Sequence, residues 1–312
     1  MVKVTHRTSK KIGAKEWKAV SVALGIMLVF AVSYIIGTSF PLLSDSSAVS
    51  TTAVGTGAAQ NSTLTAAERD AVPAGDVVLQ TRWGASIERL VASNALNVSF
   101  LNRTLSGNGH PLTVVEKGIL NGTYEGNITM NRSDAMFTLL VLWALGINNN
   151  NTIINNGPVT HSGDPYAFAS TGGYGQLGVL QLGNLNIVNL SGSQQLVANY
   201  TAQNSYRPCC NNPTFFPDCN HGAAALGLIE LMASQGASEQ SIFSALENFN
   251  SIQFPQQYTY LAAYSEMHGA EWKSVDPSIA MSYNYSSAAG AASALQYLRE
   301  NGLAPAAGGT SC

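Results

Sequence analysis

The chain has 312 residues, of which 46% are hydrophobic and only 11% are charged. An ordinary soluble protein has roughly 25% charged residues, so the polar part of this chain is mostly uncharged. The formal net charge is −3 and the bases beyond residue 18 are few and scattered, which excludes the basic surface that a nucleic-acid-binding protein needs.

The first 43 residues predict a basic tail followed by a single transmembrane anchor. Residues 1–18 hold six bases and one acid, a charge of +5, whereas the rest of the chain carries −8. Residues 19–43 contain no charged side chain, and about 20 apolar residues in a helix cross the hydrocarbon layer of a membrane. Because basic flanks stay in the cytoplasm, we expect a single-pass protein of the cell membrane with its main domain extracellular. A cleaved secretory signal is the alternative, and it also exports the main domain.

The residues after the anchor predict a stalk, a folded domain and a short tail. Residues 44–75 are small and polar and cannot bury enough surface to order themselves, so we expect an unordered stalk. Residues 76–304 form the predicted main domain, and residues 305–312 form a flexible tail that ends in Cys312. Ten N-x-[ST] sequons follow the anchor, and each is a candidate glycosylation site. They are Asn61, Asn97, Asn102, Asn121, Asn127, Asn131, Asn150, Asn189, Asn199 and Asn284.

The main domain is predicted to be mainly α, with long irregular loops and a few short strands. Residues 77–83 favour a strand, and the apolar spacing of 86–96 favours a short helix. Residues 111–120 fit either a helix or a strand.

The apolar segment that follows Ser133 and Asp134 predicts a core helix. Either of these residues suits the N-cap, and Gly146 with the asparagines after it suits the end. About 12 residues are too few to span a membrane, so this helix should be buried in the domain. Residues 147–192 are rich in glycine and asparagine and predict a long irregular region.

The C-terminal half predicts a helical bundle. A helix is expected over 193–205, and four more helices with short connections follow it. Their ranges are 221–236, 238–250, 255–269 and 286–302.

Residues 209–221 gather three cysteines and one histidine in the pattern C-C-x8-C-x-H. Cys209, Cys210, Cys219 and His221 form a ligand set that suits zinc, and the same soft ligands suit copper or iron. Asp218 is then expected to support His221 through a hydrogen bond. The sequence therefore predicts a metal site, although the spacing differs from the common C-x2-C pattern.

Two other states of these cysteines also fit the sequence, and of the three states paired cysteines are favoured. Cys219 is expected at the N-terminus of a helix, where the dipole lowers a thiol pKa, so it suits a reactive thiol. Outside the cytoplasm cysteines usually pair. Cys209–Cys219 with Cys210–Cys312, and Cys210–Cys219 with Cys209–Cys312, are then the two disulfide arrangements that avoid a strained bond between adjacent residues.

The segment "RPCCNNPTFFPDCNHG", with "FASTGGYG" upstream, resembles an uncharacterised family of membrane-anchored exported proteins of archaea and candidate-phylum bacteria. The resemblance covers roughly residues 130–300 and does not include Cys312. It implies no established activity and so no catalytic residue. Its most specific positions are Cys209, Cys210, Asp218, Cys219, Asn220, His221 and Gly222.

Three functions follow from these patterns. The first is a membrane-anchored surface protein whose Cys/His cluster forms a metal-binding or thiol-redox site. The second is a disulfide-stapled structural or adhesive glycoprotein without chemistry at its cysteines. The third is an enzyme whose site combines His161, Asp164 and His221. The expected partners are the membrane, and unidentified proteins or further copies of the chain.

Overall fold

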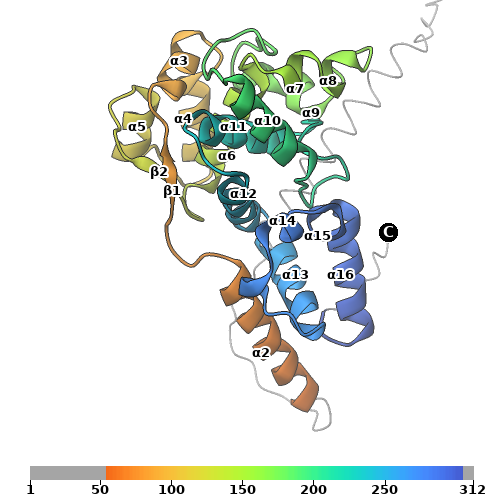
Figure 1. Ribbon diagram of the computed structural model, residues 1–312. Coiled ribbons are helices and arrows are strands. Elements are labelled where there is room, and N and C mark those ends of the chain that lie inside the picture. Colours follow the sequence, from red (N-terminus) through yellow and green to blue (C-terminus); the bar gives the residue numbers. More distant parts are fainter. Residues whose placement is uncertain (1–53, 305–312) are drawn as a thin grey trace, which may run out of the picture. The chain divides into compact units, whose positions relative to one another are not determined.

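The computed structural model describes residues 54–304, whose helices and two strands are shown in Figure 1. The predicted basic tail, the transmembrane segment 19–43 and the start of the stalk lie outside the described residues, as does the tail 305–312. Within residues 54–304, none of the helices combines the length and the hydropathy of a membrane span. The prediction of a mainly α-helical main domain is confirmed.

The N-terminal part of the main domain combines a two-stranded sheet with three short helices. Strand β1 (Val77–Arg82) pairs antiparallel with β2 (Asn127–Met130). Helices α3 (Ser86–Ala92), α4 (Val98–Gly107) and α5 (Val114–Leu120) lie between them in the chain. The predicted strand and the helix after it are confirmed.

The ambiguous segment 111–120 is a helix because its first turn is capped. The side chain of Thr113 accepts a hydrogen bond from the Glu116 N–H, and the Glu116 carboxylate accepts one from the Thr113 N–H. This reciprocal pair satisfies two of the backbone groups that a helix start leaves without partners.

Two long apolar helices, α6 (Ala135–Asn148) and α11 (Asn220–Ser234), form the centre of the larger hydrophobic core. They approach closely at two glycines. A Cβ atom on Gly146 would lie 1.9 Å from the Ala223 carbonyl oxygen, and one on Gly227 would lie 2.4 Å from the Leu142 carbonyl oxygen. Gly146, which we predicted as the end of α6, is therefore a contact residue within the helix.

The segment 147–192, predicted as irregular, belongs to α6 up to Asn148 and to α10 from Gly192, and between them it is largely irregular with four short helical turns. These are α7 (Thr152–Asn155), α8 (Pro158–His161), α9 (Ala169–Gly172) and η1 (Tyr174–Gln176). The buried side chain of Asn149 holds the backbone near the end of this segment in place through hydrogen bonds. Its Oδ1 accepts hydrogen bonds from the backbone of Ile187 and Val188, and its Nδ2 donates to Glu230 Oε2 at 3.0 Å.

The five helices predicted for the C-terminal half are present, but they contribute to two hydrophobic clusters. Helices α10 (Gly192–Gln203), α11 and α12 (Glu239–Gln253) belong to the larger core. Helices α13 (Pro255–Met267) and α16 (Ala288–Glu300) form a second cluster. Between them lie η2 (Trp272–Ser274), α14 (Pro277–Ala280) and α15 (Tyr283–Ser286).

The prediction of an unordered stalk is wrong from Val54 onward. Residues Val54–Ala71 form helix α2, which packs against α13. Ala67, Ala71 and Val72 are buried in the second cluster. The stalk was predicted because alanine and other small residues bury little surface by themselves. Alanine also favours the helical backbone, and its small side chain lets a neighbouring helix approach closely.

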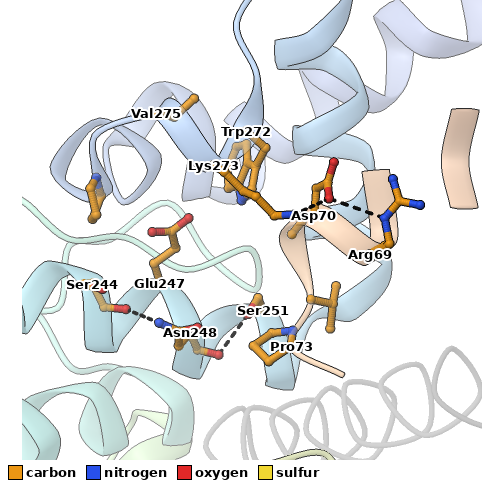
Figure 2. A pocket seen from close by; sticks show the side chains of 13 residues that line it. Arg69, Asp70, Pro73, Ser244, Glu247, Asn248, Ser251, Trp272, Lys273 and Val275 are labelled. Atoms are coloured by element: carbon orange, nitrogen blue, oxygen red, sulfur yellow. Dashed lines mark hydrogen bonds and ion pairs between the residues drawn. The ribbon is translucent and has the colours of Figure 1, made fainter. Parts of the chain in front are cut away.

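A cavity of about 400 Å³ lies where the end of α2 meets α12 and η2 (Figure 2). Asp70 there is paired with Lys273 at 2.5 Å and with Arg69 at 3.6 Å. Glu247 also lines the cavity, and burial raises its pKa to about 7, with a smaller contribution from the nearby Asp276 carboxylate. Asp70 is thus paired with both bases, whereas burial rather than a cation determines the charge of Glu247.

Candidate functional site

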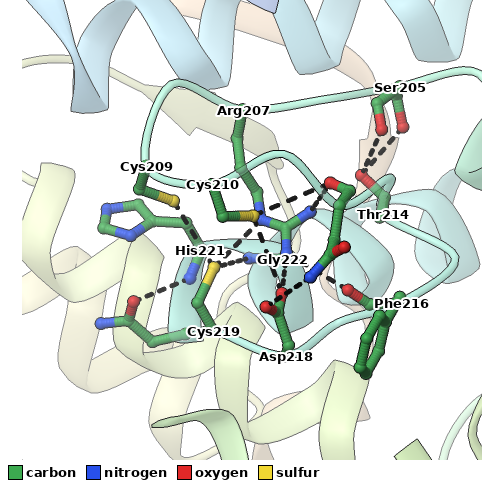
Figure 3. A network of polar contacts seen from close by, with 12 residues as sticks. Ser205, Arg207, Cys209, Cys210, Thr214, Phe216, Asp218, Cys219, His221 and Gly222 are labelled. Carbon is green, nitrogen blue, oxygen red and sulfur yellow. Dashed lines mark hydrogen bonds and ion pairs between the residues drawn. The ribbon is translucent and has the colours of Figure 1, made fainter. Parts of the chain in front are cut away.

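A buried arginine holds together the loop that carries the cysteines (Figure 3). The side chain of Arg207 is 1% exposed. Its Nη1 donates to the Asn212 carbonyl oxygen at 2.9 Å, and its Nη2 donates to the Phe216 carbonyl oxygen at 3.2 Å. The guanidinium at the start of the loop thus binds backbone carbonyls in its middle and near its end.

Asp218 supplies the negative charge opposite this arginine. Its Oδ1 accepts a hydrogen bond from Arg207 Nη2 at 2.5 Å, and its Oδ2 accepts one from Asn212 Nδ2 at 2.8 Å. A buried cation is tolerated only with such partners. We expected Asp218 to support His221, but its carboxylate instead binds Arg207 and Asn212.

Gly222 leaves room for the guanidinium. A Cβ atom at this position would lie 2.5 Å from both Cζ and Nη2 of Arg207. The glycine in the D-C-N-H-G sequence therefore has a packing role, in the first turn of α11.

Cys219 is the residue on which these interactions converge. It is the N-cap of α11, where its Sγ accepts a hydrogen bond from the Gly222 N–H at 3.4 Å. Arg207 Nε donates to the same sulfur at 3.0 Å. The Sγ atom thus lies beside a buried cation and the positive end of a helix, both of which favour a thiolate.

The other two thiols complete a cluster of three sulfur atoms. The Sγ atoms of Cys209, Cys210 and Cys219 all lie within 4.8 Å of one another, and that of Cys209 is 3.5 Å from that of Cys219. All three residues are free thiols, and Cys209 is exposed. A disulfide bond is about 2.05 Å long, so Cys209 and Cys219 are in contact without being bonded.

The three thiols differ in acidity. Hydrogen bonds from the Cys209 and Cys210 thiols, with the charge of Arg207, hold the pKa of Cys219 well below its ordinary value. Hydrogen bonding to Cys210 and Cys219 raises the pKa of Cys209 well above its ordinary value. Cys209 lowers the pKa of Cys210, but contact with Cys219 and burial outweigh this and raise it to about 12. Cys219 is therefore the thiol that ionises first.

His221 lies next to this cluster but is not one of the grouped ligands. Its ring packs against Phe254 with a centroid distance of 4.6 Å. Burial lowers its pKa to about 4, so the imidazole is neutral at pH 7. The group of ligand atoms within 4.8 Å of one another contains the three sulfurs without His221.

The residues of the predicted enzyme site make local contacts. His161 is exposed at the end of α8, with its Nδ1 3.0 Å from the Gly157 carbonyl oxygen. Asp164 accepts a hydrogen bond from the Tyr166 N–H at 3.0 Å. Their combination with His221 stays a prediction.

The described sequons lie at or near the surface. Asn97, Asn102, Asn121, Asn150, Asn189 and Asn284 are exposed, and Asn127, Asn131 and Asn199 are half-buried. The side chain of Asn61 and the residue Cys312 lie outside what the structure describes. Glycosylation and the two disulfide arrangements with Cys312 stay predictions.

Arg207 is the residue of the candidate site that the sequence did not indicate. It stands two positions before Cys209 in the R-P-C-C sequence, and that proximity was the available signal. Nothing in a linear pattern shows that a guanidinium will be buried against a sulfur twelve residues away.

The chain was compared with protein-family models, curated proteins and solved structures. No match was found in any of the three comparisons. The resemblance based on the R-P-C-C and D-C-N-H-G sequences therefore stays a prediction, and the function must be argued from the site itself.

Proposed function

We propose that the chain is a thiol–disulfide exchange protein in which Cys219 is the attacking thiolate and Cys209 is the resolving thiol. The observation that carries this proposal is the position of Cys219 Sγ, 3.0 Å from Arg207 Nε and 3.5 Å from Cys209 Sγ. Disulfide exchange needs one ionised sulfur with a second thiol within reach. The unequal acidity of the three thiols supports the same division of roles.

The reaction has two steps. The Cys219 thiolate attacks one sulfur of a disulfide substrate, forms a mixed disulfide and displaces the other substrate sulfur, which takes a proton from water. Cys209 then attacks Cys219 Sγ, the bond between Cys219 and the substrate breaks with its electron pair on the substrate sulfur, and that sulfur takes the proton that Cys209 releases. The substrate disulfide gains two electrons and two protons, and the pair is oxidised to Cys209–Cys219. A dithiol reductant reverses these steps.

We place this centre outside the cell, because the uncharged run 19–43 follows a tail of charge +5. Protease treatment of intact cells tests this location. Digestion of the main domain only after the cells are opened would contradict it.

A redox titration tests the proposed function. The full chain is equilibrated in glutathione buffers, and the disulfides are identified by peptide mass spectrometry. We expect a reversible Cys209–Cys219 bond with a midpoint between about −270 and −120 mV, the range of disulfide exchange proteins. A bond that persists below about −300 mV would instead support the disulfide-stapled structural glycoprotein. Formation of that bond should survive Cys210→Ser and should be lost in Cys209→Ser.

A metal centre is the second candidate, because the three sulfurs lie within 4.8 Å of one another. Sulfurs bound to one zinc ion at ~2.3 Å lie roughly 3.8 Å apart, which these thiols reach with small movements. Such a site would use Cys210 as a ligand, whereas the exchange mechanism forms no bond to the Cys210 sulfur. Stoichiometric zinc, copper or iron that is lost in Cys210→Ser would favour the metal centre over disulfide exchange.

A further inference from the structure

A cavity of about 300 Å³ lies beside the loop that carries the cysteines. Its walls are aromatic side chains, and the rest of its lining consists of serines and an asparagine, so no charged side chain lines it. Tyr200 comes from α10 and Phe243 from α12, with ring centroids 6.1 Å apart. Tyr206 comes from the start of the loop and Tyr283 from α15, with ring centroids 5.4 Å apart.

Exposed apolar side chains surround this cavity. Tyr200 is 48% exposed and Tyr283 is 44% exposed. Leu196, which is 70% exposed, lies four residues before Tyr200 and so on the same face of α10. A group of exposed apolar side chains around a cavity is typical of a binding site.

Two lining residues of the cavity lie close in the chain to residues of the cysteine loop or to a residue hydrogen-bonded to it. Tyr206 precedes Cys209 by three residues, so their Cα atoms are at most about 11 Å apart. Tyr283 lies five residues before Ala288, whose N–H donates to the Cys210 carbonyl oxygen at 3.0 Å. A polypeptide that reaches Cys219 is therefore within a few residues of the cavity.

We propose that this cavity binds an apolar side chain of the polypeptide that exchanges disulfides with Cys219. The substrate class is then a protein disulfide with an aliphatic or aromatic residue within about four positions of its reacting cysteine, because an extended chain rises ~3.3 Å per residue. The inference rests on the proposed exchange function. No charged side chain lines the cavity, so it cannot form ion pairs with the charged groups of glutathione disulfide. We therefore expect the cavity to accelerate the reaction of polypeptide disulfides and not that of glutathione disulfide.

The test compares three disulfides on the reduced full chain: glutathione disulfide, and two peptide disulfides that differ only in leucine or glycine near the cysteine. Removing one apolar side chain from water changes binding by about tenfold or more. We expect the leucine peptide to react about tenfold faster at low concentration. Tyr200→Ala and Tyr283→Ala should raise KM for this peptide and leave the glutathione disulfide rate unchanged. Val114→Ala, at an exposed residue of α5 outside the cavity, is the control and should change neither rate.

The outcomes separate this inference from the proposed function. If none of the three disulfides is reduced, the exchange function itself is wrong. If all are reduced and the two peptides react equally fast, exchange stands and the role of the cavity is overturned. If a neutral glucose oligomer bound at the cavity and the peptide side chain had no effect on the reduction rate, the cavity would be assigned to a carbohydrate. That result would overturn the inference as well.

Discussion

Arg207 explains more of the cysteine loop than any other residue. Its guanidinium contacts two backbone carbonyls, one carboxylate and the sulfur of Cys219, and its burial makes each of these contacts energetically costly to lose. The same group therefore determines the conformation of the loop and the acidity of its central thiol.

Replacing this arginine should destabilise the protein strongly. Arg207→Met leaves the Asp218 carboxylate without its cation and two carbonyls without donors, so we expect a loss of about 3–5 kcal/mol in the free energy of unfolding. Chemical denaturation of the reduced protein measures this loss. Arg132→Met is the matched control, because Arg132 pairs with Glu68 at the surface, with side chains 49% and 47% exposed. That change should cost no more than about 1 kcal/mol, and equal losses in the two variants would contradict the role given to Arg207.

The helices show which sequence signals are reliable. Ser238 and Pro255 predicted the starts of α12 and α13, and the structure places Ser238 as the N-cap and Pro255 in the first turn. Both signals are local, because a cap or a proline acts on the adjacent backbone. Gly146 was misread as a helix end because its role depends on α11, which lies about 80 residues further along the chain.

The close approach of α6 and α11 can be tested at this glycine. Gly146→Ala would place a methyl group 1.9 Å from the Ala223 carbonyl oxygen, so the two helices must separate. We expect a loss of about 1–3 kcal/mol in stability, measured by denaturant unfolding. Gly107→Ala at the end of α4 is the control, because nothing lies within 4 Å of the added Cβ. Unchanged stability in Gly146→Ala would show that the helices are not packed this closely.

Glu247 couples the stability of the whole molecule to pH. Burial raises its pKa to about 7 in the folded protein, whereas a glutamate in an unfolded chain has a pKa of ~4.3. The folded state therefore keeps a proton that the unfolded state releases. The resulting stability is fully present below about pH 4 and is lost as the pH rises through 7.

The effect of Glu247 is measured as the difference in the free energy of unfolding between the wild type and Glu247→Gln. His221 titrates in the opposite sense, because its pKa is lowered to about 4, and subtraction removes its contribution. We expect the stability of the wild type relative to the variant to fall between pH 4 and pH 8 by no more than about 3 kcal/mol. Thermal unfolding across this range measures it. A difference that is constant with pH would mean that Glu247 is not held in its neutral form.

At the scale of the whole molecule, the sequence predicted the helical class and the location of the site, but not the arrangement within the site. Cys209, Cys210 and Cys219 were grouped correctly because they are close in the sequence, and the structure brings their sulfurs together. The position of His221 against Phe254 and of Asp218 against Arg207 depends on side chains that meet only after folding. Residue types and spacing carry no information about such contacts.

The acidity of the individual cysteines tests the central claim most directly. The reduced full chain is treated with iodoacetamide over a range of pH, and the alkylation rate of each cysteine is followed by peptide mass spectrometry. We predict that the rate at Cys219 reaches its plateau well below pH ~8.5, the ordinary thiol value, while the rates at Cys209 and Cys210 still increase above it. If Cys219 titrates at or above that value, it is not a stabilised thiolate and the exchange mechanism is wrong.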